Sequence, residues 1–460
     1  MGAFPAGRGP RHSTAVRTAA LLAAGAAALT AGTGPGGRAT AAPAAVHVRP
    51  ASAGHISALG LSAPMATSAC VAKVGLHCYS PLQYRAAYHL DPLYREGITG
   101  KGRTIVIVDS FGSPTIQHDL ETFDRQWGIP DTEVEVVKWG KVPPFDPANQ
   151  EHLGWAGEST LDVEYAHAIA PDAHIVLVET PVAETEGVTG LPEMMDAEKA
   201  LIDAGRADVV SQSFGATENT FPGFDQGAFS SLTDLRYAFK AAAQHGVTVL
   251  AASGDNGATD STDSTAAAGS LYPYRVDSWP SSDPLVTSVG GTQLTLDDSG
   301  NRTAPDRVWN DKYGAGGGGI SGVFARPWYQ AGVAQVTGDH RGTPDISMSA
   351  AVDGAAWTYE SYDPHQAGWH LTGGTSEATP IFSGIVALAD QLAGHRLGQL
   401  NWRMYSLSRL PARQSGIVDV TAGNNSWGGV DGYQAVRGYD LASGLGTIDG
   451  ARFVHSIAGR

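Results

Sequence analysis

The sequence predicts an α/β domain built on a central, mostly parallel sheet that helices flank on both faces. Short β-branched runs alternate with helical patterns between residues 104 and 252, and a repeated strand–helix order gives a parallel sheet. Glycine and proline account for 58 and 26 of the 460 residues, as expected for a chain with many turns. Only 17% of residues are charged while 42% are apolar, which excludes a coiled coil and global disorder.

The expected elements follow one another in a regular order. Buried strands are predicted at 104–109, 133–139, 175–178, 208–211 and 247–252. Helices are predicted at 114–127, 158–168, 192–204, 231–245 and 376–392. Sites in such sheets lie beyond the carboxyl ends of the strands, where Asp109 and Asp255 both stand.

The first 41 residues have the pattern of an export signal. They hold four arginines and no acidic residue, an Ala- and Leu-rich stretch at 18–31, and small residues at Ala39 and Ala41. A disordered Ala/Gly tail is the alternative. The Ala-, Ser- and Pro-rich residues 42–69 are expected to be a linker, and 70–460 the folded domain. No later segment has the length and apolarity of a membrane span, so we expect a secreted protein without membrane attachment once the signal is removed.

The cysteines and the net charge limit which compartment and which partners the sequence allows. Cys70 and Cys78 close a short loop in an exported chain, which predicts a disulfide. The formal charge of -16 argues against nucleic acid or an anionic membrane as the main partner.

The segment Leu371-Thr-Gly-Gly-Thr-Ser-Glu-Ala-Thr-Pro380 predicts a nucleophile. Ser376 opens a long apolar helix, where free backbone N–H groups and the helix dipole stabilise an oxyanion. Pro380 falls near the first turn, where a missing N–H costs little. An ordinary serine N-cap is the alternative.

Acidic residues are the candidates for the base that a serine nucleophile needs. Glu158 and Asp162 are four residues apart and share one face of a helix, so two shielded carboxyls there would share a proton. Glu164 is expected on the exposed face of that helix. Asp255 lies between glycines after a strand, and a neutral carboxyl there can donate to an oxyanion. A solvated helix start and a plain turn Asp are the alternatives.

Together these segments resemble the sedolisin family, the serine-carboxyl peptidases, over roughly residues 78–458. The family has Glu and Asp four apart on one helix, Asp in Ser-Gly-Asp-x-Gly and Ser in Gly-Thr-Ser-x-x-x-Pro, and all three occur here in that order. The resemblance implies a subtilisin-like fold with Ser376 as nucleophile and Glu158 as general base. Asp162 would orient Glu158 and share its proton, and Asp255 would complete the oxyanion hole.

The resemblance also implies one bound Ca²⁺ near the C-terminus. Its ligands would be the side chains of Asp419 and Asp440 and the carbonyl oxygens of Val420, Val436 and Gly438. Two carboxylates with several carbonyls suit a hard cation that takes six or more oxygens. Val436 departs from the glycine usual in the family, although a carbonyl ligand does not require glycine. A hydrated acidic turn is the alternative.

The function implied is that of a secreted serine-carboxyl endopeptidase, monomeric by default, that cleaves protein or peptide substrates at acidic pH. Two departures from the family are expected: the segment between the expected signal and Cys70 is too short for the large folded propeptide that family precursors usually carry, and Phe214 stands where tryptophan is frequent. Three alternatives stay open. One is a subtilisin-type peptidase using Asp109 and a distant histidine. The second is a catalytically silent peptide-binding protein that keeps the fold, and the third is a calcium-dependent adhesion module.

Overall fold

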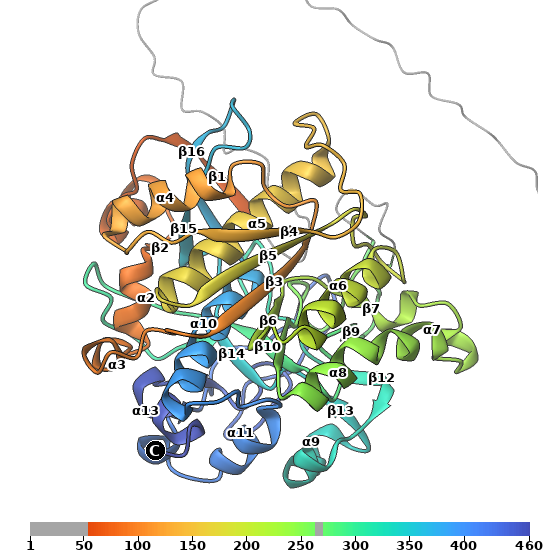
Figure 1. Ribbon diagram of the computed structural model, residues 1–460. Coiled ribbons are helices and arrows are strands. Elements are labelled where there is room, and N and C mark those ends of the chain that lie inside the picture. Colours follow the sequence, from red (N-terminus) through yellow and green to blue (C-terminus); the bar gives the residue numbers. More distant parts are fainter. Residues whose placement is uncertain (1–53, 263–269) are drawn as a thin grey trace, which may run out of the picture. The chain divides into compact units, whose positions relative to one another are not determined.

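The computed structural model describes residues 54–262 and 270–460 (Figure 1). The expected export signal, residues 1–41, and the first part of the expected linker lie outside the described residues. None of the helices in the described part is both long enough and apolar enough to cross a membrane.

The central sheet confirms the predicted fold class. Its strands run in the order β11-β10-β8-β6-β3-β5-β4, and β14 also pairs with β10. Every pair is parallel except β10 with β11. The bounds are β3 (Thr104–Ser110), β4 (Val134–Lys138), β5 (His174–Thr180), β6 (Val209–Gln212), β8 (Thr248–Ala252), β10 (Thr287–Gln293), β11 (Arg307–Val308) and β14 (Ile346–Ser349).

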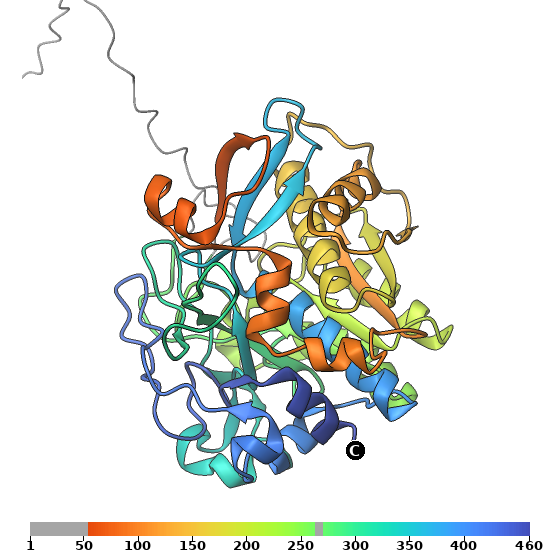
Figure 2. The same cartoon turned by 90° about the vertical axis from the view of Figure 1, so that its left-hand side faces the viewer.

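Helices cover both faces of this sheet (Figures 1 and 2). Because side chains alternate along a strand, Ile105 and Ile107 of β3 belong to one hydrophobic core, and Val106 and Val108 belong to the other. The first core contains residues of α4 (Ile116–Trp127), α5 (Gln150–Ile169), α10 (Thr375–Ala393) and α13 (Gly450–Ile457). The second contains residues of α6 (Leu191–Asp203) and α8 (Tyr237–His245).

Helix α5 begins at Gln150, eight residues before the predicted start. The Asn149 side chain caps it by accepting from the N–H of Glu151 at 2.9 Å. Glu158 and Asp162 therefore lie inside a long helix rather than at an exposed start, and every residue from 155 to 169 is buried. The helix predicted at 231–245 is broken into α7 (Ser230–Thr233), a 3₁₀ turn and α8.

Helices α5 and α10 approach each other closely at a glycine. A Cβ added to Gly384 would stand 2.6 Å from Cβ of Ile169, a distance that real Cβ atoms do not adopt. Gly384 therefore allows the two helices that carry Glu158 and Ser376 to pack together.

A second sheet, in the order β1-β16-β15-β2, corrects the expected linker. Residues 54–61 form β1 (Gly54–Leu61), which pairs antiparallel with β16 (Gly368–Gly373), and α1 (Thr67–Lys73) follows. Composition favours a linker here, but pairing with β16 covers what would be an open sheet edge, and tertiary context overrides local preference. The other strands are β15 (Ala355–Glu360) and β2 (Cys78–Tyr79).

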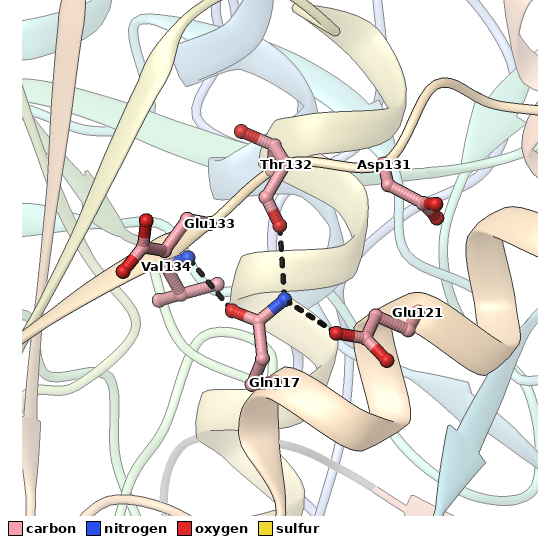
Figure 3. Close-up of a pocket in the computed structure, with 6 residues that line it drawn as sticks. All are labelled: Gln117, Glu121, Asp131, Thr132, Glu133 and Val134. Atoms are coloured by element: carbon pink, nitrogen blue, oxygen red, sulfur yellow. Dashed lines mark hydrogen bonds between the residues drawn. The ribbon is translucent and has the colours of Figure 1, made fainter.

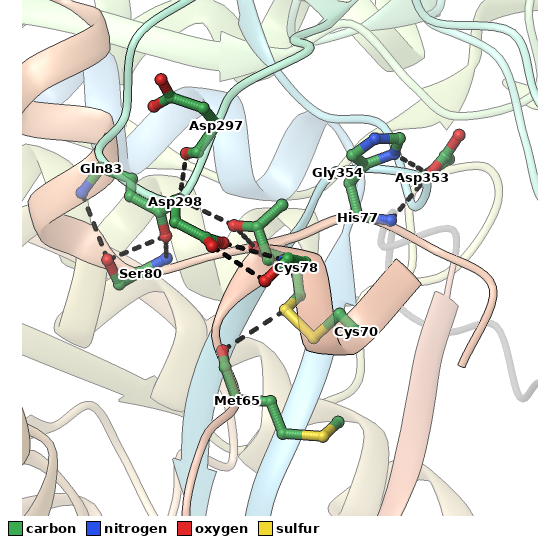
Figure 4. The surroundings of a disulfide bond; sticks show 12 residues. Met65, Cys70, His77, Cys78, Ser80, Gln83, Asp297, Asp298, Asp353 and Gly354 are labelled. Carbon is green, nitrogen blue, oxygen red and sulfur yellow. Dashed lines mark hydrogen bonds and ion pairs between the residues drawn. A yellow bond between two sulfur atoms is a disulfide. The ribbon is translucent and has the colours of Figure 1, made fainter. Parts of the chain in front are cut away.

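The expected disulfide joins Cys70 of α1 to Cys78 of β2 (Figure 4). The hydroxyl of Thr67 donates to the carbonyl of Cys78 at 2.8 Å. Next along the chain, Ser80 and Gln83 form a capping box at the start of α2 (Pro81–Ala87). The disulfide and the cap together fix the segment that leads to α2.

The remaining elements are short. They are α3 (Asp91–Arg95), β7 (Ala216–Thr217), β9 (Ser278–Trp279), β12 (Ile320–Ala325), α9 (Ala334–Thr337), β13 (His340–Gly342), α11 (Asn401–Leu407), α12 (Ala412–Ser415), β17 (Ile417–Val418) and β18 (Thr447–Ile448).

Candidate active site

Ser376 is the second residue of α10, directly after strand β16. Gly374 between them has φ of 138°, a conformation that favours glycine, and its N–H donates to the carbonyl of Ala350 at 2.6 Å. Ser376 is fully buried. Within the described residues its Oγ makes no hydrogen bond and its N–H donates to no acceptor. Because the N–H groups at a helix start have no intrahelical partner, this position suits a developing oxyanion.

Asp255 is held against the residue that precedes Ser376. Its Oδ1 accepts from the N–H of Thr375 at 2.7 Å and from the Thr375 hydroxyl at 2.8 Å. The Thr375 hydroxyl in turn accepts from the N–H of Gly254 at 3.1 Å. With Oδ1 fixed as an acceptor, the proton of a neutral Asp255 would sit on Oδ2. Asp255 thereby links the loop after β8 to the start of α10.

Asp162 on α5 is connected to Ser376 through Ser213. The Ser213 hydroxyl lies 2.8 Å from Oδ1 of Asp162 and 3.5 Å from the carbonyl oxygen of Ser376. Burial raises the pKa of Asp162 well above its ordinary value, and the nearby carboxyls of Asp109 and Glu158 raise it further. Asp162 therefore favours its protonated form, and the Ser213 contact places it next to the predicted nucleophile.

Asp109, at the end of β3, is a third buried carboxyl in this group. Burial raises the pKa of Asp109 to about 7, against a lowering effect of the Ser159 hydroxyl and a further rise from Glu179. The sequence assigns Asp109 only to a histidine-dependent alternative. Its position at a strand end could have marked Asp109 as a site residue. Its proximity to Asp162, however, depends on how α5 packs over β3.

The structure therefore places Glu158 and Asp162 on one buried helix. Ser213 connects Asp162 to the start of α10, and Thr375 connects Asp255 to it. Thr375 lies in the segment that predicts the nucleophile and Ser213 directly precedes Phe214, but neither was predicted to act there. The exposed position expected for Glu164 is wrong. Glu164 is fully buried and its carboxyl accepts from the N–H of Tyr359 on β15, at 3.2 Å. Helix α5 is covered on all sides, so it has no solvent face at this point.

Histidine takes no part in this group among the residues that the structure describes. No histidine in the described part of the chain forms a hydrogen bond with Ser376 Oγ or with the carboxyl oxygens of Asp109. The buried His167 lies 3.3 Å from Asp124, and His370 lies 3.9 Å from Glu360.

The predicted calcium ligands lie in two chain segments that touch. Oδ2 of Asp419 accepts from the N–H of Gly438 at 2.9 Å, and Oδ2 of Asp440 accepts from the N–H of Val436 at 2.8 Å. No hydrogen bond from a described residue reaches the carbonyl oxygens of Val420, Val436 or Gly438. Two carboxylates and three unengaged carbonyls are a donor set that fits Ca²⁺.

A surface hollow elsewhere contains none of the predicted site residues (Figure 3). It is lined by Gln117, Glu121, Asp131, Thr132, Glu133 and Val134. The Gln117 side chain spans it, donating to the carbonyl of Thr132 at 3.0 Å and accepting from the N–H of Val134 at 3.0 Å. Hydrogen bonds therefore connect the residues that line this hollow.

Comparison with known proteins defines the class of the molecule. Residues 151–433 match the subtilase family, a span that includes Glu158, Asp162, Asp255 and Ser376. The chain belongs to the subtilase family.

Within this class, the chain is similar to the sedolisins, as the sequence predicts. It is 31% identical to kumamolisin of Bacillus sp. (strain MN-32), over 82% of this chain and 63% of that protein. It is 29% identical to sedolisin of Pseudomonas sp. (strain 101), over 77% of this chain and 57% of that protein. The chain thus spans less than two thirds of the length of these relatives.

A solved structure supports the same likeness. It is that of Pseudomonas sedolisin, a serine-carboxyl proteinase, complexed with two molecules of pseudo-iodotyrostatin. The TM-score is 0.68 with 26% identity, covering 84% of this chain and 99% of that chain. The subtilisin-like fold is confirmed by this match.

Proposed function

We propose that the protein is a secreted serine-carboxyl endopeptidase that hydrolyses peptide bonds of protein or peptide substrates at acidic pH. The observation that carries the proposal is a cluster of buried carboxyls, made by Asp109 at the end of β3 and by Glu158 and Asp162 on α5. Ser213 joins Asp162 of this cluster to the carbonyl oxygen of Ser376. The absence of a histidine partner for Ser376 among the described residues supports a carboxyl base.

The chemistry assigns one role to each residue. Ser376 Oγ attacks the scissile carbonyl while Glu158 accepts its proton, and Asp162 orients Glu158 and shares that proton. The developing oxyanion accepts from the Ser376 N–H and from the protonated Asp255. The proton held by Glu158 then passes to the leaving amine, and water attacks the acyl-enzyme to release the second product.

Acidity suits this machinery for a physical reason. The raised pKa values of Asp162 and Asp109 keep both neutral in acid, so α5 does not bury several negative charges side by side. An imidazole base would already be protonated under the same conditions. Rising pH ionises the group and makes the buried carboxylates repel one another.

One Ca²⁺ is part of the proposal, held by Asp419 and Asp440 with the carbonyls of Val420, Val436 and Gly438. Its chemistry would be structural: it would neutralise two carboxylates and tie the segment at 417–440 to the domain. Secretion is proposed from the basic, Ala-rich N-terminal 41 residues.

The test is proteolysis of a denatured protein from about pH 2 to about pH 8 by the wild type, Ser376→Ala and Glu158→Ala. We expect activity that peaks in acid and is lost in both variants. An N-terminally blocked peptide, cleaved internally, would distinguish endopeptidase from tripeptidyl exopeptidase activity.

Two outcomes would contradict the proposal. Activity near pH 8 that survives Glu158→Ala would indicate a histidine base. Complete inactivity of folded, calcium-loaded protein at every pH would favour a silent peptide-binding protein.

A further inference from the structure

Glu377 follows the predicted nucleophile directly and has no role in the chemistry above. It lies in the first turn of α10, is fully buried, and its N–H donates to the carbonyl of Gly374 at 2.9 Å. Neither carboxyl oxygen has a hydrogen bond of ordinary geometry to a described residue. An acidic side chain is rarely buried in this way without a partner.

Four buried tyrosines lie close enough for Glu377 to raise their pKa values. They are here called the tyrosine cage: Tyr79 of β2, Tyr84 of α2, Tyr88 at the end of α2 and Tyr165 of α5. The rings pack edge to face, with centroids 5.9 Å apart for Tyr79 and Tyr84 and 5.6 Å apart for Tyr84 and Tyr165. The Ser349 hydroxyl of β14 is the other polar group close enough to act on Glu377.

The cage has little to offer a negative charge, because three of its four hydroxyls already donate elsewhere. Those of Tyr79, Tyr84 and Tyr165 donate to the carbonyls of Leu294, Gly354 and Trp357, at 2.9–3.1 Å. That of Tyr88 accepts from the N–H of Ser349 at 2.8 Å.

The charged groups around the cage do not compensate for Glu377 either. Arg302 lies over the ring of Tyr88 but is paired with Asp306 at 2.7 Å. Other charged groups near the cage are acids: Asp353 raises the pKa of Tyr79, and Glu164 raises the pKa of Tyr165. Among the described residues, no cation shifts the titration of Glu377.

We propose that Glu377 is a positioning residue: in its neutral form it seats the first turn of α10 in the tyrosine cage, and its ionisation displaces that turn and Ser376 with it. The proposal rests on the serine-peptidase function proposed above. In this proposal the segment from β2 to the end of α2, which supplies three of the four tyrosines, helps to hold the predicted nucleophile in place.

The physical argument is one of solvation. Burial raises the pKa of Glu377 to about 8, and the hydroxyls of Tyr84 and Ser349 offset only part of that rise. An ionised Glu377 must reach water or new donors, and it has no free route because Ser376 and Glu377 are consecutive in one helical turn. Relief therefore requires the turn itself to move.

The experiment compares the full chain with Glu377→Gln and Glu377→Met, which are neutral at every pH. The matched control is Asp390→Asn, at the far end of the same helix. Asp390 is also buried, with a pKa that burial raises to about 7, but its Oδ1 accepts from the N–H of Leu397 at 2.8 Å. Readouts are kcat and KM on one peptide from about pH 3 to about pH 9, and hydrogen exchange of the first turn of α10.

We expect both Glu377 variants to move the alkaline limb of kcat upward by about one pH unit or more, with KM within about twofold. The exchange protection of residues 375–379 falls between about pH 5 and about pH 8 in the wild type and not in these variants. An alkaline limb that coincides with that of the wild type, or one that Asp390→Asn moves equally, would overturn the proposal.

Failure of the proposed function would look different. If the wild type cleaves nothing at any pH, the peptidase proposal fails, while the hydrogen-exchange comparison still decides the role of Glu377. Exchange that is independent of pH in the wild type would then overturn the inference on its own.

Discussion

Two regions of this molecule bury carboxyl groups, and they neutralise them by different means. Around Ser376 the acids Asp109, Asp162 and Glu377 are fully buried, with pKa values that burial raises. Directly before β14, Asp345 is equally buried, but the Arg341 guanidinium contacts both of its oxygens, at 2.7 and 2.5 Å. Tyr405 and the N–H of Ser288 add hydrogen bonds at 2.9 Å.

The difference shows which of the two regions changes its charge with pH. A bidentate arginine keeps its charge at every relevant pH, so the region of Arg341 is a permanent part of the framework. The region of Ser376 relies on bound protons, so its stability and its chemistry both depend on acidity.

The largest expected effect comes from removing the acid that shares the proton in the first region. Asp162→Asn should lower kcat by about 10²- to 10⁴-fold with little change in KM, because the hydrogen bond from Ser213 is kept but the exchangeable proton is lost. Steady-state kinetics in acid checks this. Glu164→Gln, on the same helix and equally buried, is the control and should change kcat by no more than about threefold. An equal loss in both variants would contradict a specific role for Asp162.

The next largest effect is expected when Asp345 loses its arginine partner, so that it becomes a buried acid without a cation, like those around Ser376. Arg341→Leu leaves Asp345 buried without its cation and should destabilise the fold by about 3–5 kcal/mol near neutral pH. The loss should be smaller in acid, where a proton can replace the guanidinium. Denaturant unfolding at two pH values measures both. Lys199→Leu, which removes an exposed pair with Asp203, should cost no more than about 1 kcal/mol.

A third test concerns stability alone. The folded-state pKa of Asp109, about 7, lies above its ordinary value of 3.8, so the folded state holds a proton that the unfolded chain releases as pH rises between these values. Wild-type stability therefore falls with rising pH across that window. Asp109→Asn should match the wild type near pH 3 and exceed it by up to about 4 kcal/mol near pH 7. Unfolding curves that keep the same separation at both pH values would contradict this sign.

The smallest expected effect lies outside both regions, at the proposed calcium site. Chelation should lower the free energy of unfolding by about 2.7 kcal/mol relative to protein in Ca²⁺ at a hundred times its Kd. Asp419→Asn should abolish this difference, whereas Asp431→Asn, an exposed acid in the same segment, should keep it. A melting temperature that changes neither with the chelator nor with Asp419→Asn would contradict the calcium proposal.

The sequence was a good guide wherever one local pattern decides the outcome. The β-branched runs of β3, β5, β6 and β8 became strands within a residue or two, because each is buried on both faces. The spacing of Glu158 and Asp162 placed them correctly on one helix.

What escaped the sequence depends on partners distant in the chain. Strand β1 exists because β16 offers an edge more than three hundred residues later. The burial of Glu164 and Glu377 likewise comes from Tyr359 and from the tyrosine cage, which no local period reveals. Composition and spacing describe a segment, whereas the proton state of an acid is fixed by what packs around it.

Gly384 has a consequence beyond packing. With no room for a methyl group against Ile169, it fixes the separation of the helices that carry Glu158 and Ser376. It stands eight residues beyond Ser376, roughly 12 Å along the helix axis. A side chain at this position would push apart the two helices that carry the predicted acid and the predicted nucleophile. The spacing of the predicted catalytic residues thus depends on a buried position in the middle of α10.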